Sequence, residues 1–216
     1  RILPVVDVSG SMSCPAGGST SVTCMDVAVS LGLYLSERQT GVFQDQFITF
    51  SEAPKLQKVT GTLSQRLEQM RRSDWGMSTN LEAVFDLILQ AAVQSNVEES
   101  QMPKKIIIFS DMEFNSAIRE RGSNSAYFGR PRGQVANPPA MEMIEQQYAD
   151  AGYKIPQVVF WNLNARPGNV PIAAHKSGAA LVSGFSPALL TSLLGDETFT
   201  PEGIMVKTVM KPRYDF

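Results

Sequence analysis

The stretch Ile2-Leu3-Pro4-Val5-Val6-Asp7-Val8-Ser9-Gly10-Ser11 decides the fold of this 216-residue chain. It is an apolar run followed by a carboxylate and two hydroxyls, with one residue between each pair. A continuous apolar run is typical of a strand buried on both faces, as in a parallel sheet. The polar side chains then lie in the loop above the carboxyl end of that strand. Oxygen ligands of this kind suit a hard cation such as Mg²⁺ or Mn²⁺ rather than zinc.

Two later segments add to this pattern. Gly76-Met77-Ser78-Thr79-Asn80 opens a stretch in which apolar residues recur at helical spacing, and Lys105-Ile106-Ile107-Ile108-Phe109-Ser110-Asp111 is a second apolar strand ending in an acid. Taken singly, the acids are explained as caps after strands, and Thr79 or Ser78 as the N-cap of the helix. Taken together, oxygen-bearing residues at two strand ends and at a helix start favour one site for a hard cation.

Strands and helices alternate along the chain, which favours a mostly parallel sheet covered by helices on both faces. The predicted strands are Ile2–Val8, Gln46–Phe50, Lys55–Val59, Lys105–Ser110, Gln157–Trp161 and Ala179–Val182. The predicted helices are Met25–Leu35, Leu63–Arg72, Thr79–Gln94, Met141–Ala151 and Pro187–Leu194. The second and third strands form a hairpin, which places one antiparallel strand at a sheet edge. The fold class is therefore α/β: a doubly wound, Rossmann-like, six-stranded sheet that binds ligands at the carboxyl ends of its central strands.

The order D-x-S-x-S, Thr at a helix start, and strand-terminal Asp resembles the metal-ion-dependent adhesion site of von Willebrand factor A (vWA) domains. Some segments are similar to sequences of an uncharacterised family of plants, fungi, bacteria and large viruses with a C-terminal vWA-like domain. Examples are Asp74-Trp75-Gly76-Met77-Ser78-Thr79-Asn80 and Phe109-Ser110-Asp111-Met112-Glu113-Phe114. That family resembles in turn the vWA domain of the Ro ribonucleoprotein. The resemblance implies the vWA fold and a cation held, directly or through water, by five residues: Asp7, Ser9, Ser11, Thr79 and Asp111. It also implies that a Glu or Asp carboxylate of a partner protein completes the coordination.

Four further residues are candidates for the rim of this site. Glu113 either orients metal-bound water or is a solvated loop acid. Trp75 either forms an exposed rim beside the metal or packs in the core. Gly10 and Ser78 lie within the motif segments and are expected to line the ligand face.

The irregular segment 114–140 suggests a second function. Arginines and aromatic residues alternate in it: Arg119, Arg121, Tyr127, Phe128, Arg130 and Arg132. Arginines can pair with phosphates while aromatic rings stack on unpaired bases, so an RNA-associated role is the alternative to a protein-interaction role. A solvated surface loop is the simpler interpretation of the same residues.

Composition and missing motifs bound the other possibilities. The net charge of −2 gives no global nucleic-acid signature, and no apolar run is long enough for a membrane span. The chain begins with Arg1, so we expect residues 1–216 to be one domain, the C-terminal part of a longer protein. Cys14 and Cys24 are either free thiols or a disulfide closing a short loop. With no N-x-S/T sequon present, we expect free thiols in an intracellular, cytoplasmic protein.

The sequence contains no G-x-x-x-x-G-K-S/T loop, no H-E-x-x-H and no G-x-S-x-G elbow, and it has a single histidine. Catalysis is therefore not expected, and a metal-dependent phosphoesterase ranks third. The leading hypothesis is a non-catalytic module that binds Mg²⁺, or Mn²⁺, and an acidic side chain of a partner protein. RNA remains the second candidate partner, a membrane is not expected, and the sequence predicts no particular oligomeric state.

Overall fold

The computed structural model describes residues 1–17, 19, 21–76, 80–111, 138–164, 172–174 and 179–184. Across these residues the chain builds a seven-stranded sheet with the order β3-β2-β1-β4-β5-β7-β6. The strands are β1 (Ile2–Val6), β2 (Gln46–Thr49), β3 (Leu56–Lys58), β4 (Lys105–Ser110), β5 (Gln157–Asn162), β6 (Ile172–Ala174) and β7 (Ala179–Ser183). The five inner strands are parallel, and β3 and β6 are antiparallel edges. The predicted α/β class and the predicted hairpin at one edge are confirmed.

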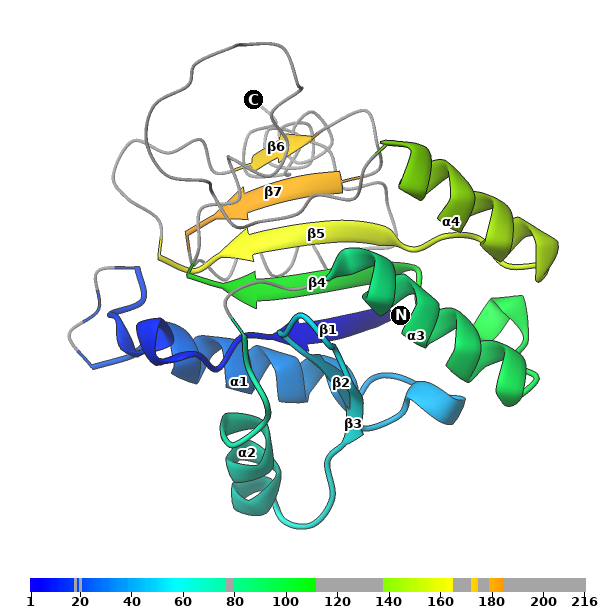
Figure 1. The fold of residues 1–216 in the computed structure, drawn as a ribbon. Helices are drawn as coiled ribbons and strands as arrows, with labels where there is room; N and C mark the ends of the chain where they lie inside the picture. The colour runs from blue at the N-terminus through cyan, green and yellow to red at the C-terminus, as the bar shows by residue number, and fades with distance from the viewer. Residues whose placement is uncertain are drawn as a thin grey trace, which may run out of the picture.

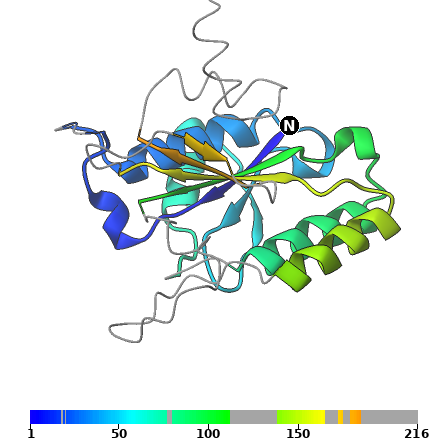
Figure 2. The same cartoon turned by 90° about the horizontal axis from the view of Figure 1, so that it is seen from above.

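The helices lie on both faces of this sheet (Figures 1 and 2). The α-helices are α1 (Cys24–Ser36), α2 (Leu63–Arg71), α3 (Leu81–Gln94) and α4 (Pro138–Asp150), and the short 3-10 turns are η1 (Gly10–Ser13), η2 (Gly41–Phe43) and η3 (Glu99–Gln101). Figure 2 shows α1 on one side of the sheet and α3 and α4 on the other. The doubly wound arrangement predicted from the alternation of strands and helices is therefore present.

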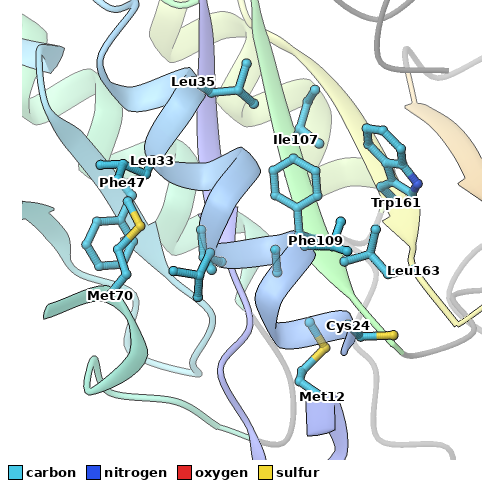
Figure 3. Packing of buried hydrophobic residues seen from close by; sticks show 14 of the residues in the cluster. Met12, Cys24, Leu33, Leu35, Phe47, Met70, Ile107, Phe109, Trp161 and Leu163 are labelled. Atoms are coloured by element: carbon cyan, nitrogen blue, oxygen red, sulfur yellow. The ribbon is translucent and has the colours of Figure 1, made fainter. Parts of the chain in front are cut away.

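Alternate residues of the inner strands feed two separate cores. In β1, Val6 packs with α1, whereas Val5 packs with α3 and α4. The α1 core contains Phe109 and Trp161, whose ring centroids are 5.5 Å apart. Figure 3 shows them in the same cluster as Met12 and Cys24. Because both faces of the sheet are covered, the inner strands are apolar throughout, and only their ends carry polar side chains.

Local capping explains where the helices begin. The side chains of Thr23 and Thr62 accept hydrogen bonds from the backbone N–H groups of Asp26 and Gln65, respectively. In return, the side chains of Asp26 and Gln65 accept the backbone N–H groups of the two threonines, which completes a capping box at each helix. At the start of α3 the cap is Asn80, whose Oδ1 accepts the Ala83 N–H at 3.2 Å. Asn80 is therefore the N-cap, and the alternative interpretation of Thr79 or Ser78 as the N-cap of this helix is wrong.

Other differences from the prediction concern ends and short elements. The sheet gains β6, which pairs antiparallel with β7 and adds a seventh strand to the six expected. The first strand ends at Val6 rather than Val8, and α4 begins at Pro138 rather than Met141. The predicted helix Pro187–Leu194 lies outside the described residues. Among the described helices, none has the length and apolar character that a membrane crossing would need.

Candidate metal centre

The first and fourth strands bring two polar strand ends side by side. Val6 of β1 pairs with Phe109 of β4, and the Asp7 N–H continues this ladder by donating to the Phe109 carbonyl at 3.1 Å. The neighbours of β1 are β2 on one side and β4 on the other, so the strand order reverses here. In doubly wound folds the crevice at such a reversal is where ligands bind. Asp7 and Asp111 therefore follow neighbouring central strands, as predicted.

Asp7 is almost completely buried, with 1% of its surface exposed. Its Oδ1 accepts the backbone N–H of Ser9 at 2.9 Å, and its Oδ2 accepts the hydroxyl of Ser110 at 2.7 Å. Burial raises the pKa of the Asp7 carboxyl above its usual value of 3.8. The hydrogen bonds oppose this rise, and the negative charge of Asp111 adds to it. A carboxylate held at this position therefore favours a positive charge nearby.

Three side-chain oxygens form a continuous line above Asp7. The hydroxyls of Ser9 and Ser11 share a hydrogen bond at 3.0 Å, and the Ser11 hydroxyl donates to Asp111 Oδ1 at 3.1 Å. Ligand oxygens about 2.1 Å from an octahedral cation lie about 3.0 Å apart along each edge of the octahedron. The spacing of the Ser9, Ser11 and Asp111 oxygens matches such edges.

The composition of this cluster fits Mg²⁺ or Mn²⁺. It offers two carboxylates and serine hydroxyls, and no third His, Cys, Asp or Glu joins them among the described residues. Of the ion pairs formed within the described part of the chain, none involves Asp7 or Asp111. The cluster is thus an all-oxygen site, which hard divalent cations prefer.

The segment before α3 lies along the same edge of the sheet. The Phe50 N–H donates to the Val6 carbonyl at 3.3 Å, and the Gly76 N–H donates to the Phe50 carbonyl at 2.9 Å. A side chain at Gly76 would lie 3.2 Å from the Ser51 Cα, so this close approach favours glycine. Trp75 is 54% exposed, so it does not pack in the core; its place at the rim of the metal site stays a prediction.

The ligand face is open at Gly10 and Ser11, both of which are exposed. A Cβ built on Gly10 would meet no atom within 4 Å. Among the residues that the structure describes, none blocks the approach to Gly10.

Several predicted residues lie outside the described part of the chain. They are Ser78, Thr79, Glu113, Arg119, Arg121, Tyr127, Phe128, Arg130 and Arg132. The described neighbour of Thr79 is Asn80, whose N–H donates to the Ser51 carbonyl at 3.3 Å, at the end of β2. The roles proposed for these nine residues stay predictions.

Ser110 is the site residue that the motif did not identify. Its hydroxyl fixes one oxygen of Asp7, although it belongs to the other strand. A serine at the end of an apolar strand looks ordinary in sequence, and only the register between β1 and β4 places it against Asp7.

Two thiols lie next to this centre. Cys14 follows η1, Cys24 begins α1, and the two sulfurs are 3.4 Å apart as free thiols. Burial raises the pKa of the Cys24 thiol to about 12; the Cys14 hydrogen bond and the negative charges of Cys14 and Asp111 act in the same direction. Cys24 is thus close enough to Asp111 to sense its charge.

Comparisons with solved structures give distant likenesses. The chain is similar to the Ro (RSR) protein of Deinococcus radiodurans, with 18% identity, a TM-score of 0.48, and coverage of 87% of this chain and 32% of that one. It is also similar to an aerotolerance-related membrane protein of Bacteroides fragilis, with 16% identity, a TM-score of 0.38, and coverage of 87% and 83%.

Comparison with known sequences gives a nearer relative. The chain is 32% identical over 214 residues to the uncharacterized protein L728 of Acanthamoeba polyphaga mimivirus. The match covers 98% of this chain but 33% of that protein, so the chain spans about a third of its relative's length. A family model described as a domain of unknown function, DUF7788, matches residues 1–213. The chain therefore belongs to the DUF7788 family.

Proposed function

We propose that this chain is a non-catalytic, Mg²⁺-dependent interaction module that binds a Glu or Asp carboxylate of a partner protein. The observation that supports this most directly is the line of oxygens from Ser9 through Ser11 to Asp111, with steps of 3.0 and 3.1 Å above the buried Asp7. When bound, the cation would supply an electrophilic position for an anionic oxygen.

Each described residue has a distinct part in this proposal. Ser9, Ser11 and Asp111 hold the cation with side-chain oxygens. Asp7 supplies buried negative charge, and because each of its oxygens already accepts one hydrogen bond, it acts through a remaining lone pair or through water. Ser110 fixes the orientation of Asp7. Thr79 is the fifth ligand, on the strength of the motif alone.

A carboxylate ligand fits the balance of charge. The charges of Asp7 and Asp111 together equal that of one divalent cation. The loaded site therefore has no surplus negative charge to repel an anionic group of a partner. The partner can reach the site from the side of Gly10 and Ser11, which are exposed. Trp75 has about half of its surface exposed, and exposed tryptophans are frequent anchors in protein interfaces, which supports its proposed role as a contact for the partner.

A binding role also accounts for the side chains better than catalysis does. In the described part of the site both carboxylates accept hydrogen bonds from serines, and the proposal assigns Asp7 and Asp111 to the cation rather than to proton transfer. The resemblance to vWA domains supports the same choice, because in that family the open coordination position takes a partner's acidic side chain.

Mn²⁺ and water-proton relaxation test the proposal with one sample. Mn²⁺ bound to the protein with water in its coordination shell enhances the relaxation of bulk water. Glutarate is then added to occupy the open position, with neutral glutaramide as the matched control. We expect enhancement in the wild-type chain, a decrease with glutarate, and no change with glutaramide.

The Ser9→Ala variant shows whether the effect belongs to this site. It should bind Mn²⁺ more weakly, so that both the enhancement and its response to glutarate shrink. Enhancement that glutarate leaves unchanged would contradict the carboxylate role while leaving the metal site in place. The absence of any enhancement in the wild-type chain would contradict the metal site itself.

A further inference from the structure

The two cysteines of the chain are brought together by the loop that follows the metal site. Cys14 directly follows η1, and Cys24 is the first residue of α1. Their sulfurs are in contact at 3.4 Å, and both are free thiols. A disulfide bond needs a sulfur–sulfur separation of about 2.05 Å, so the two sulfurs must move closer by about 1.4 Å.

The backbone around the two cysteines already has a suitable register. Pro15 and Thr23 form an antiparallel bridge, which places Cys14 directly opposite Cys24. The Cys24 N–H donates to the Cys14 carbonyl, and the Ala16 N–H donates to the Val22 carbonyl, each at 2.9 Å. Opposite residues of antiparallel strands have Cα atoms about 4.5–5.5 Å apart, within the usual range of disulfides. The backbone register and the sulfur contact therefore favour a bond between these two residues.

The two thiols differ in how easily a reagent can reach them. Cys14 is half-buried, whereas Cys24 is fully buried and packs in the core beside Met12 (Figure 3). The Cys24 sulfur also lies 3.8 Å from the Pro15 carbonyl oxygen. A small oxidant from solvent thus meets Cys14 first, and Cys24 is within reach of the Cys14 sulfur. This is the arrangement of an attacking thiol and a resolving thiol.

We propose that Cys14 and Cys24 form a reversible dithiol–disulfide pair, oxidised by a low-molecular-weight disulfide of the glutathione type. The Cys14 thiolate attacks one sulfur of the small disulfide, whose S–S bond breaks and releases one small thiolate. The Cys24 thiol then loses its proton, and its sulfur attacks the Cys14 sulfur and expels the second small thiolate. Two protein thiols are oxidised, one small disulfide is reduced to two thiols, and the two protons pass to the departing thiolates.

The location of the pair gives the oxidation a structural consequence. The Cys14 N–H donates to the Ser11 carbonyl at 3.1 Å, so Cys14 closes the turn that presents the Ser11 hydroxyl. A disulfide to Cys24 would tie this turn to the first residue of α1. The inference goes beyond the proposed function, and it stands or falls independently of metal binding.

The test uses the 216-residue chain equilibrated, with EDTA present, in buffers of oxidised and reduced glutathione. Remaining thiols are alkylated under denaturing conditions, and the products are identified by mass spectrometry. We expect oxidised glutathione to give a single-chain product that has lost two hydrogens, carries no glutathione and takes up no alkylating reagent. Excess reduced glutathione should return both thiols.

Two variants separate the roles of the cysteines. Cys24→Ala keeps a small apolar group at the buried position, and it should stop at one glutathione attached to Cys14. Cys14→Ser should leave the buried Cys24 alkylatable and free of glutathione. The wild-type result decides the proposal even if a variant fails to fold.

Three outcomes in the wild-type chain would overturn the proposal. In the first, both thiols stay alkylatable in oxidised glutathione. In the second, glutathione stays attached to Cys14 while Cys24 remains a free thiol. In the third, the disulfides that form link separate chains. A bond that forms but resists excess reduced glutathione would also contradict reversibility.

Discussion

At the scale of single residues, Asp7 is the part of the site that most disfavours folding. It is 1% exposed, and burial raises its pKa although two hydrogen bonds oppose the rise. An ionised acid in this position disfavours folding unless a positive charge compensates it. Residues of a binding site are commonly less favourable for stability than their replacements, and Asp7 is expected to follow this rule.

The Asp7→Asn variant tests this trade-off. The Asn Oδ1 can still accept the Ser9 N–H, and its Nδ2 can donate to the Ser110 hydroxyl once that hydroxyl turns from donor to acceptor. The buried charge is removed, so in EDTA at neutral pH we expect the unfolding free energy to rise by about 1 kcal/mol. Because the folded-state pKa of Asp7 is raised, its penalty applies above that pKa and disappears as pH falls through it toward 3.8. Urea unfolding of both proteins across this range should show the difference shrink with falling pH. A variant that is less stable than wild type in EDTA would contradict the account of Asp7.

Ser11 and Ser13 form a matched pair for testing the ligand assignment. Both are exposed and belong to η1, but only Ser11 lies in the line of oxygens. We expect Ser11→Ala to weaken Mg²⁺ binding about tenfold, equivalent to about 1.4 kcal/mol, and Ser13→Ala to leave it unchanged. Calorimetric titration of each variant measures both values. Equal affinities in the two variants would remove Ser11 from the site.

At the scale of elements, the contact between α1 and β1 holds the first strand end in place. Gly32 is buried in α1, and a Cβ there would lie 2.6 Å from Cγ2 of Val6, the residue before Asp7. The helix can approach the strand this closely only because Gly32 has no side chain.

The Gly32→Ala variant should therefore destabilise the chain. Overpacking against Val6 costs about 1–3 kcal/mol, and the better helix propensity of alanine recovers at most about 1 kcal/mol. Ser30 lies on the exposed side of the same helix, so Ser30→Ala improves helix propensity without overpacking. This variant should be neutral or slightly stabilising. Denaturant unfolding of the two variants compares them directly. Equal stabilities would mean that α1 can shift away from β1 without cost.

The elements that sequence patterns predicted well are those with strong local signals. The apolar runs of β1 and β4 and the hairpin of β2 and β3 follow from composition and turn residues alone. The three-residue β6 is too short to show any period, and its pairing with β7 depends on distant sequence. Ser78, Thr79 and Asn80 are all residue types that cap helices well, so local sequence does not choose among them; in the structure Asn80 is the N-cap of α3.

The residues of the candidate site also differ in how well local sequence predicts them. Asp7, Ser9, Ser11 and Asp111 follow from a local motif and from the rule that parallel strands end at one edge of a sheet. Ser110 does not, because its contact with Asp7 depends on the register between strands 103 residues apart. Contacts of this kind are set by tertiary packing, which a single sequence does not encode in any short pattern.

At the scale of the whole molecule, the site occupies the position that the topology makes available. Two apolar cores cover the faces of the sheet, and the polar side chains gather where β1 and β4 end. The strand order reverses at this point, and in doubly wound folds such a reversal is where ligands bind. The fold thus brings two acids and three serines together while its interior stays apolar.

Calorimetric titration of Mg²⁺ into the wild-type chain and the Asp7→Asn variant tests the central claim most directly. The account predicts saturable binding of one ion by the wild-type chain and loss of that binding in the variant, which should stay folded. A wild-type chain that binds no Mg²⁺, or a variant that binds it with the same affinity, would contradict the assignment of this cluster as a metal centre.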